Sequence, residues 1–137
     1  MELTREQAII EHRKMWNWIA DETERRKCVV NKREYIRSKR SHDEGVLLFD
    51  CYCCEYSHGY AYQRRDSTRA YCKYCPIDWP SRAELWKCEH SQFNDEKGLY
   101  RLWITAYNKR SYRQAATIAR QIATLPERTD NIPNETK

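Results

Sequence analysis

Four of the seven cysteines form two Cys-x2-Cys pairs, Cys51/Cys54 and Cys72/Cys75, with 17 residues between the pairs. Each pair can turn two thiolates towards one point, and four thiolates complete the tetrahedral shell that Zn²⁺ prefers. A linker of about 15 to 20 residues is typical of such structural zinc sites. The spacing therefore predicts a structural zinc ion bound by these four thiolates, within a zinc region at about residues 46–90.

Other residues near the two pairs are alternate zinc ligands. Cys88 is the first alternate, followed by Cys53 and His90. For Cys53 and Cys28, a small buried apolar residue is a better interpretation than a ligand. Four available thiolates favour a closed coordination shell, so we expect the zinc to contribute folding free energy, on the order of 10 kcal/mol, rather than catalysis.

The pattern of histidines and glycines argues against several classes of enzyme. The three glycines are isolated, so the sequence contains neither the Gly-rich motif of a dinucleotide-binding loop nor that of a P-loop. The sequence contains no recognisable Ser/His/Asp or Cys/His catalytic motif. In a metal-dependent nuclease, the candidate site residues would be His58 and His90 with Asp78. We therefore expect a non-enzymatic protein, with a nuclease and sequestration of a signalling nucleotide as minor alternatives.

The formal net charge of +5 is concentrated in one window. Residues 25–40 contain eight basic residues and one acid, Glu34, whereas the rest of the chain sums to −2. Such a stripe fits nucleic-acid phosphates or an acidic protein surface. It fits the solvated end of a helix equally well, because cations stabilise the carbonyl groups there. The basic residues of this stripe are Arg25, Arg26, Lys27, Lys32, Arg33, Arg37, Lys39 and Arg40.

A second candidate surface combines tyrosine and arginine in the loop expected between the two cysteine pairs. Tyrosine rings can stack on bases while guanidinium groups contact phosphates. The same residue types are enriched in protein interface hot spots, and some of these tyrosines are expected to cover the zinc as part of the core. The candidate binding residues on this surface are Tyr60, Tyr62, Arg64, Arg65 and Arg69.

Capping signals and apolar periodicity predict the elements of the N-terminal half. Residues 4–7 have the sequence of a capping box, and the apolar spacing that follows predicts a helix over residues 5–26. A second capping box begins at Asn31 and predicts a short helix that ends before a loop at residues 38–45. Residues 46–49 are expected to form a short strand or extended segment.

The C-terminal half is also expected to be helical. A capping box predicts a short helix at residues 81–86, so that the second cysteine pair leads into a helix as in a treble-clef-like arrangement. Single apolar faces within residues 99–106 and 111–122 predict an αα-hairpin. Pro126 ends the second helix, and residues 127–137 are expected to form a disordered tail.

Val, Ile, Leu and Phe supply only 21 of the 137 residues, so the apolar core must be small. Five Trp and ten Tyr nevertheless argue against disorder. We therefore predict a mainly α fold, with a single zinc-stabilised helical domain over residues 1–126. Its core is enlarged by Trp16, Trp79, Trp86 and Trp103.

Five segments carry a resemblance to known proteins: MWNWIA (15–20), CYCCEY (51–56), CKYCPIDW (72–79), GLYRLW (98–103) and ARQIATLPER (119–128). In these segments the chain resembles a family of small bacteriophage-encoded cysteine-motif proteins, with zinc knuckles, from phages of Gram-positive hosts. The resemblance covers about residues 5–128. It implies a phage accessory protein with a zinc knuckle and brings no established activity.

These observations lead to one functional hypothesis and one main alternative. The hypothesis is a zinc-binding phage accessory protein that binds, and inhibits or redirects, a host protein or defence complex. The alternative is a zinc-dependent protein that binds DNA or RNA through the basic stripe and the Tyr/Arg loop. The odd number of cysteines, the absence of a signal-peptide pattern and the absence of a long apolar run predict a reduced, cytoplasmic compartment without membrane contact, which is the host cytoplasm for a phage protein.

Overall fold

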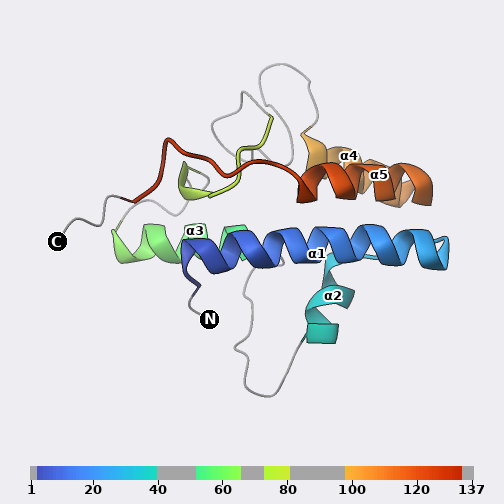
Figure 1. The fold of residues 1–137 in the computed structure, drawn as a ribbon, viewed down its shortest axis with the longest axis horizontal. Helices are drawn as coiled ribbons and strands as arrows, with labels where there is room; N and C mark the ends of the chain where they lie inside the picture. Colours follow the sequence, from blue (N-terminus) through green and yellow to red (C-terminus); the bar gives the residue numbers. More distant parts are fainter. Residues whose placement is uncertain (1–2, 40–51, 66–72, 81–97, 134–137) are drawn as a thin grey trace.

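The computed structural model describes residues 3–39, 52–65, 73–80 and 98–133 (Figure 1). The described part is mainly helical, as the sequence predicts, and contains an isolated antiparallel bridge between Ile77 and Glu127. None of its helices is long and apolar enough to cross a membrane. Its helices are α1 (Arg5–Arg26), α2 (Lys32–Lys39), α3 (Tyr52–Gln63), α4 (Leu99–Asn108) and α5 (Tyr112–Ala123).

The longest helix, α1, has the bounds that its sequence predicts. Thr4 and Gln7 form the predicted capping box: the Thr4 hydroxyl accepts from the Gln7 backbone N–H, and the Gln7 side chain accepts from the Thr4 backbone N–H. The buried residues recur at helical spacing along one side, which therefore faces the core. They are Ala8, Ile9, His12, Met15, Trp16, Ile19, Ala20 and Thr23.

Helix α1 lies at the centre of the fold, with α5 packed along it and α4 packed against α5 (Figure 1). Helices α2 and α3 contact α1 as well. At the centre of this packing, the Trp16 ring meets the Trp103 ring edge-on, with 5.2 Å between the ring centroids. Trp16, Trp79 and Trp103 are all buried, as predicted, and Trp86 lies outside the described residues.

The short helix α2 extends slightly further than its sequence predicts. The Asn31 side chain accepts from the Glu34 backbone N–H and so caps the first turn. At the other end, the helix continues through Ser38, whose hydroxyl donates to the Tyr35 carbonyl at 2.7 Å. The predicted start of the loop at residue 38 is therefore too early, because α2 ends at Lys39.

Helix α3 corrects the expectation that the cysteine pairs are joined by a loop. Its buried side chains include Tyr52, Cys53 and Tyr56, which recur at helical spacing against α1. The Ser57 hydroxyl donates to the Cys53 carbonyl within the helix at 2.6 Å. Tyr60 and Tyr62 consequently lie on a helix rather than in a loop.

The segment after α5 pairs with residues 73–80, which differs from the disordered tail predicted from residue 127. The Asp78 backbone N–H donates to the Pro126 carbonyl at 2.9 Å, and the Arg128 backbone N–H donates to the Pro76 carbonyl at 2.7 Å. Arg5, at the start of α1, forms an ion pair with Glu127 and a hydrogen bond to the Arg128 carbonyl. The polar composition of residues 127–137 gives no sign of these backbone contacts.

Helices α4 and α5 cover the two segments for which the sequence predicts C-terminal helices. The predicted short strand at residues 46–49 and the predicted helix at residues 81–86 lie outside the described residues.

Candidate functional site

The described residues include one cysteine of each predicted Cys-x2-Cys pair. Cys54 lies in the first turn of α3, and Cys75 follows a short turn at residues 73–74. Among the residues that the structure describes, no three His, Cys, Asp or Glu side chains are placed to hold a metal ion together. The other predicted ligands lie outside the described residues: Cys51, Cys72, Cys88 and His90.

Aromatic contacts bring the two cysteine segments together. The ring of Tyr60 on α3 lies 4.9 Å, centroid to centroid, from the ring of Tyr74, which precedes Cys75. A four-thiolate site needs its two pairs on neighbouring segments. Tyr60 lies six residues after Cys54, so the contact places α3 beside residues 73–74 but does not itself place Cys54 beside Cys75.

Asn131 holds the backbone beside Cys75. Its side-chain Nδ2 donates to the carbonyl oxygens of Lys73 and Cys75, each at 2.8 Å. The sequence analysis missed this residue because a single asparagine in a polar segment gives no signal of its distant partners.

The remaining described cysteines differ from each other in burial. Cys53 is 1% exposed and belongs to the core, with its Sγ 4.0 Å from the Ala8 carbonyl oxygen, in agreement with the role of a small buried residue. Cys28 was expected to be buried as well, but it is exposed. Cys28 lies two residues beyond the end of α1, and the chain returns to the core only at Val30, which is 1% exposed.

A group of aromatic and basic side chains lies where α3 meets residues 73–74. Tyr60 stacks on Tyr56 at 5.8 Å between ring centroids. The guanidinium of Arg64 lies 4.5 Å from the centre of the Tyr60 ring, and the Lys73 ammonium lies 5.1 Å from the centre of the Tyr74 ring. These five residues are called the aromatic–basic cluster below.

The other candidates on this surface have different positions. Tyr62 is the most exposed of the large apolar side chains described, at 76%. Arg65 follows α3 with a left-handed backbone, φ 56°. Arg69 lies outside the described residues.

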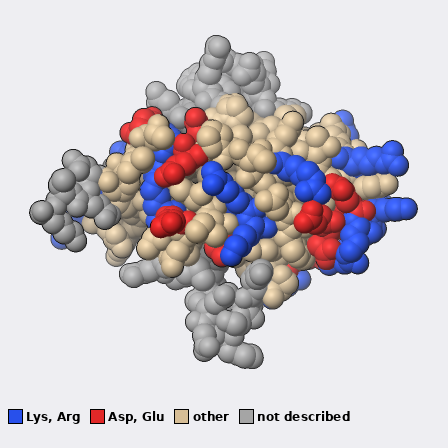
Figure 2. Space-filling view, in the orientation of Figure 1, with Lys and Arg blue, Asp and Glu red and all other residues tan. Residues whose placement is uncertain are grey.

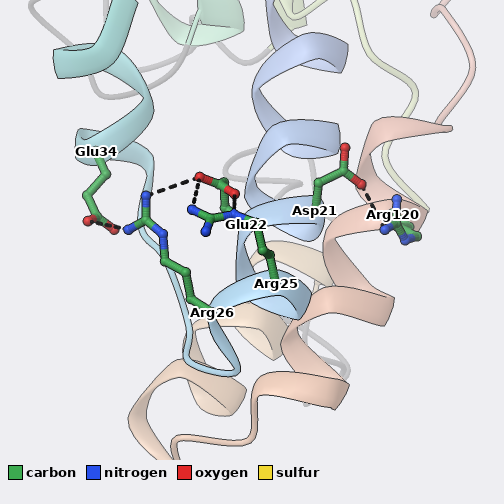
Figure 3. A network of polar contacts seen from close by, with 6 residues as sticks. All are labelled: Asp21, Glu22, Arg25, Arg26, Glu34 and Arg120. Atoms are coloured by element: carbon green, nitrogen blue, oxygen red, sulfur yellow. Dashed lines mark hydrogen bonds and ion pairs between the residues drawn. The ribbon is translucent and has the colours of Figure 1, made fainter.

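Part of the predicted basic stripe is neutralised by acids of its own neighbourhood (Figure 3). Glu22 forms ion pairs with Arg25, at 2.6 Å, and with Arg26, at 3.2 Å. Arg26 also reaches Glu34 on α2 at 3.2 Å. The hydrogen bonds from Arg25, and then those from Arg26, lower the pKa of Glu22 from its ordinary 4.5 to about 2.

The rest of the stripe is spread over several environments. Lys32 lies over the Tyr100 ring, with its Nζ 4.2 Å from the ring centre. Arg33 and Arg37 are exposed on α2, and Lys27 is exposed directly after α1. The side chain of Lys39 and all of Arg40 lie outside the described residues.

Two further polar features could not be foreseen from sequence patterns. Arg120 on α5 reaches back to α1 and pairs with Glu24 at 2.8 Å and Asp21 at 2.9 Å, which raises the pKa of its guanidinium. His12 is fully buried against the edge of Trp79, and neither ring nitrogen has a hydrogen-bond partner among the described residues. Its helical spacing predicts that His12 faces the core, but not that it lacks partners.

Of the three residues considered for a nuclease, two are described. His58 is half-buried on α3, Asp78 is exposed, and His90 lies outside the described residues.

Comparison of the chain with protein-family models, with curated proteins and with solved structures found no match.

Proposed function

We propose that this protein is a non-enzymatic, zinc-binding phage accessory protein that binds, and thereby inhibits or redirects, a host protein or defence complex. The observation that carries the proposal is the aromatic–basic cluster at the junction of α3 and residues 73–74.

The cluster has the chemistry of an interface hot spot. Tyrosine and arginine are enriched at such positions because a rigid ring and a planar cation give much contact area. A cation over an aromatic ring contributes roughly 0.5 to 1 kcal/mol when exposed and about 2 kcal/mol when water is excluded. Arg64 over Tyr60 therefore gains stabilisation when a partner covers it.

The charge distribution favours a protein over a nucleic acid. Binding to phosphates depends on the number of cations that can displace counterions. Arg25 and Arg26 already have carboxylate partners, so the stripe offers fewer free cations than its sequence implies. One observation favours the nucleic-acid alternative: the highly exposed Tyr62 ring lies near Arg64 and Arg65 in the chain and has the chemistry to stack on a base.

We further propose a structural zinc ion that joins the start of α3 to residues 72–75 in a treble-clef-like arrangement, completed by a C-terminal αα-hairpin. The contact between Tyr60 and Tyr74 and the hydrogen bonds from Asn131 to the Cys75 turn support this placement. The zinc would fix the cluster residues relative to one another, so binding is expected to depend on the metal.

The proposal is tested by affinity capture from an extract of a Gram-positive host, with a variant that changes Arg64 of the cluster and the exposed Tyr62 two residues before it. Arg64→Ala combined with Tyr62→Ala is expected to reduce retention of the partner by at least about tenfold, the effect of one hot-spot residue. Arg113→Ala is a matched control, because Arg113 lies over its own neighbour Tyr112 on α5, away from the cluster. Capture that is unchanged by the double variant would overturn the proposal.

A second arm of the experiment separates protein from nucleic acid. Single-stranded DNA and RNA 30-mers of mixed sequence are titrated at about 50 mM salt, where phosphate contacts are strongest. The proposal predicts no binding. Binding that is lost in the double variant and retained in Arg113→Ala would instead establish the nucleic-acid alternative.

A further inference from the structure

A pocket of about 580 Å³ lies where α1 ends and α4 is connected to α5. Its volume lies in the range of about 300 to 1,000 Å³ that is usual for small-molecule sites. The pocket is lined by Lys27, Cys28, Val29, Tyr107, Asn108 and Arg110.

The pocket lining contains two cations and no acid, and acids near it have partners of their own. Figure 2 shows Lys and Arg side chains crowded at this end of the molecule, around a group of acids. Glu22 is held by Arg25, and Glu24 is held by Arg120. Among the residues that the structure describes, neither Lys27 nor Arg110 has an ion-pair partner, so the pocket presents two cations that an anionic ligand can neutralise.

The backbone at these two cations is unusual. Lys27 has φ 54° and Arg110 has φ 56°, both in the left-handed region that favours glycine. A glycine would end each helix with less strain, and strained positions of this kind cluster at functional sites. Cations at helix C-termini also interact favourably with the terminal carbonyl groups, so the glycine variants described below are needed to separate a capping role from a binding role.

The other lining residues add aromatic and polar chemistry. Tyr107 is 39% exposed, and its ring packs at 5.6 Å against that of Trp103, so that the core supports it from one side. Asn108 carries both a donor and an acceptor on its side-chain amide. Together these groups offer a ring for stacking and an amide for recognition of a polar edge.

We propose that this pocket binds a small phosphorylated ligand that carries an aromatic ring, of the class of a nucleoside monophosphate. Lys27 and Arg110 bind the phosphoryl group, Tyr107 stacks on the ring, and Asn108 pairs with the ring edge. This function is additional to the partner binding proposed above, because the pocket lies at the end of α1 and the aromatic–basic cluster lies where α3 meets residues 73–74.

The test is calorimetric titration with adenosine 5′-monophosphate, inorganic phosphate and adenosine. The nucleotide is expected to bind more tightly than either fragment. Lys27→Gly and Arg110→Gly each remove a cation from a position where glycine is favoured, so each is expected to weaken nucleotide binding at least about tenfold while the melting temperature stays unchanged or rises. Arg65→Gly is the matched control, since Arg65 also has a left-handed backbone but does not line the pocket.

Undetectable nucleotide binding at millimolar concentration would overturn the proposal. So would unchanged binding in the double variant Lys27→Gly with Arg110→Gly, which would leave the two cations with a capping role. Equal affinities for the nucleotide and inorganic phosphate would overturn the stacking on Tyr107.

Cys28 provides a readout of the position of the ligand. Its thiol is exposed and lines the pocket, so a bound nucleotide should slow its alkylation by iodoacetamide, measured peptide by peptide with mass spectrometry. The protection is expected to disappear in Arg110→Gly and to persist in Arg65→Gly. An alkylation rate at Cys28 that does not change at saturating nucleotide would place the ligand elsewhere and overturn the site.

Discussion

Two parts of the molecule are held together in different ways. The helical half consists of α1, α4 and α5, and the knuckle half consists of α3 with residues 73–80 and 126–131. In the helical half, Ile19, Ala119 and Ile122 are fully buried and α5 packs along α1. In the knuckle half, the contacts between segments include tyrosine rings and backbone hydrogen bonds, such as the one from Arg128 to Pro76. The helical half draws its stability from apolar burial, whereas the knuckle half adds tyrosine and backbone contacts to its buried Cys53, Ile77 and Trp79, and a cross-link such as zinc would stabilise it further.

Removal of zinc is expected to have the largest effect and to separate the two halves. Loss of the ion should cost on the order of 10 kcal/mol of folding free energy, because a structural zinc site forms only together with its fold. We expect EDTA to abolish amide hydrogen-exchange protection in α3 and residues 73–80 while α1 and α5 remain protected. Loss of protection in both halves to the same extent would contradict the proposal that zinc stabilises the knuckle half more than the helical half.

Cysteine variants check that this effect comes from the metal. Cys54→Ser and Cys75→Ser are each expected to lower the zinc content, measured by elemental analysis, well below one ion per chain. Cys28→Ser is the control, because the exposed Cys28 lies in the pocket at the other end of α1. Protein that carries no zinc when purified without chelator would contradict the zinc prediction itself.

Trp16→Ala is expected to have the largest effect of a single substitution in the helical half. The Trp16 side chain is 2% exposed and contacts Trp103 and Tyr100, so its removal leaves a large cavity. The expected loss is about 3 to 5 kcal/mol of unfolding free energy, measured by urea denaturation. Ile10→Ala on the same helix, where the side chain is 44% exposed, should change it by less than about 0.5 kcal/mol.

The same contrast explains which features the sequence could predict. The bounds of α1 follow from the Thr4 capping box and from apolar spacing, both of which are local. The spacing of Tyr52, Cys53 and Tyr56 carries the same helical signal, but it overlaps the Cys-x2-Cys pattern, which we interpreted as a turn. Local patterns therefore predict helices well where only one interpretation is available.

Long-range polar contacts could not be predicted from the sequence. Glu22 lies one turn before Arg25 and Arg26, so their pairing is a local feature that helical spacing could have revealed. The partners of Arg120 and Asn131 are distant in the chain, and only the packing of α5 on α1 and of the C-terminal segment on residues 73–78 brings them together. The pocket beside Lys27 has the same origin, because its two sides come from the ends of α1 and α4.

Asn131→Ala tests the polar contacts of the knuckle half. The substitution removes two hydrogen bonds and leaves the carbonyls of Lys73 and Cys75 without this donor, which should cost about 1 to 2 kcal/mol of unfolding free energy. Asn131→Asp should cost more, because a carboxylate offers only acceptors to these carbonyls. Thr129→Ala, at an exposed neighbouring position, is the control. Equal stability of all three variants, measured by urea denaturation, would mean that the side chain of Asn131 does not stabilise the knuckle half.

The smallest expected effect concerns the charged surface of the helical half. The pKa of Glu22 is about 2 in the folded protein and 4.5 ordinarily, because Arg25 and Arg26 favour its charged form. Its contribution to stability is therefore complete above pH 4.5 and is lost as the pH falls from 4.5 towards 2, where the unfolded chain binds a proton that the folded chain does not. Glu22→Gln should make the free energy of unfolding less steeply dependent on pH in this window, and 1 M salt should weaken the same dependence in the unmodified protein, since the pair is near the surface. Ile10→Ala, which changes a 44% exposed side chain on the same helix and removes no titratable group, should leave the steepness unchanged. An equal change in both variants would mean that the Glu22 ion pairs do not persist in solution, and that the cations of the stripe are available to a partner after all.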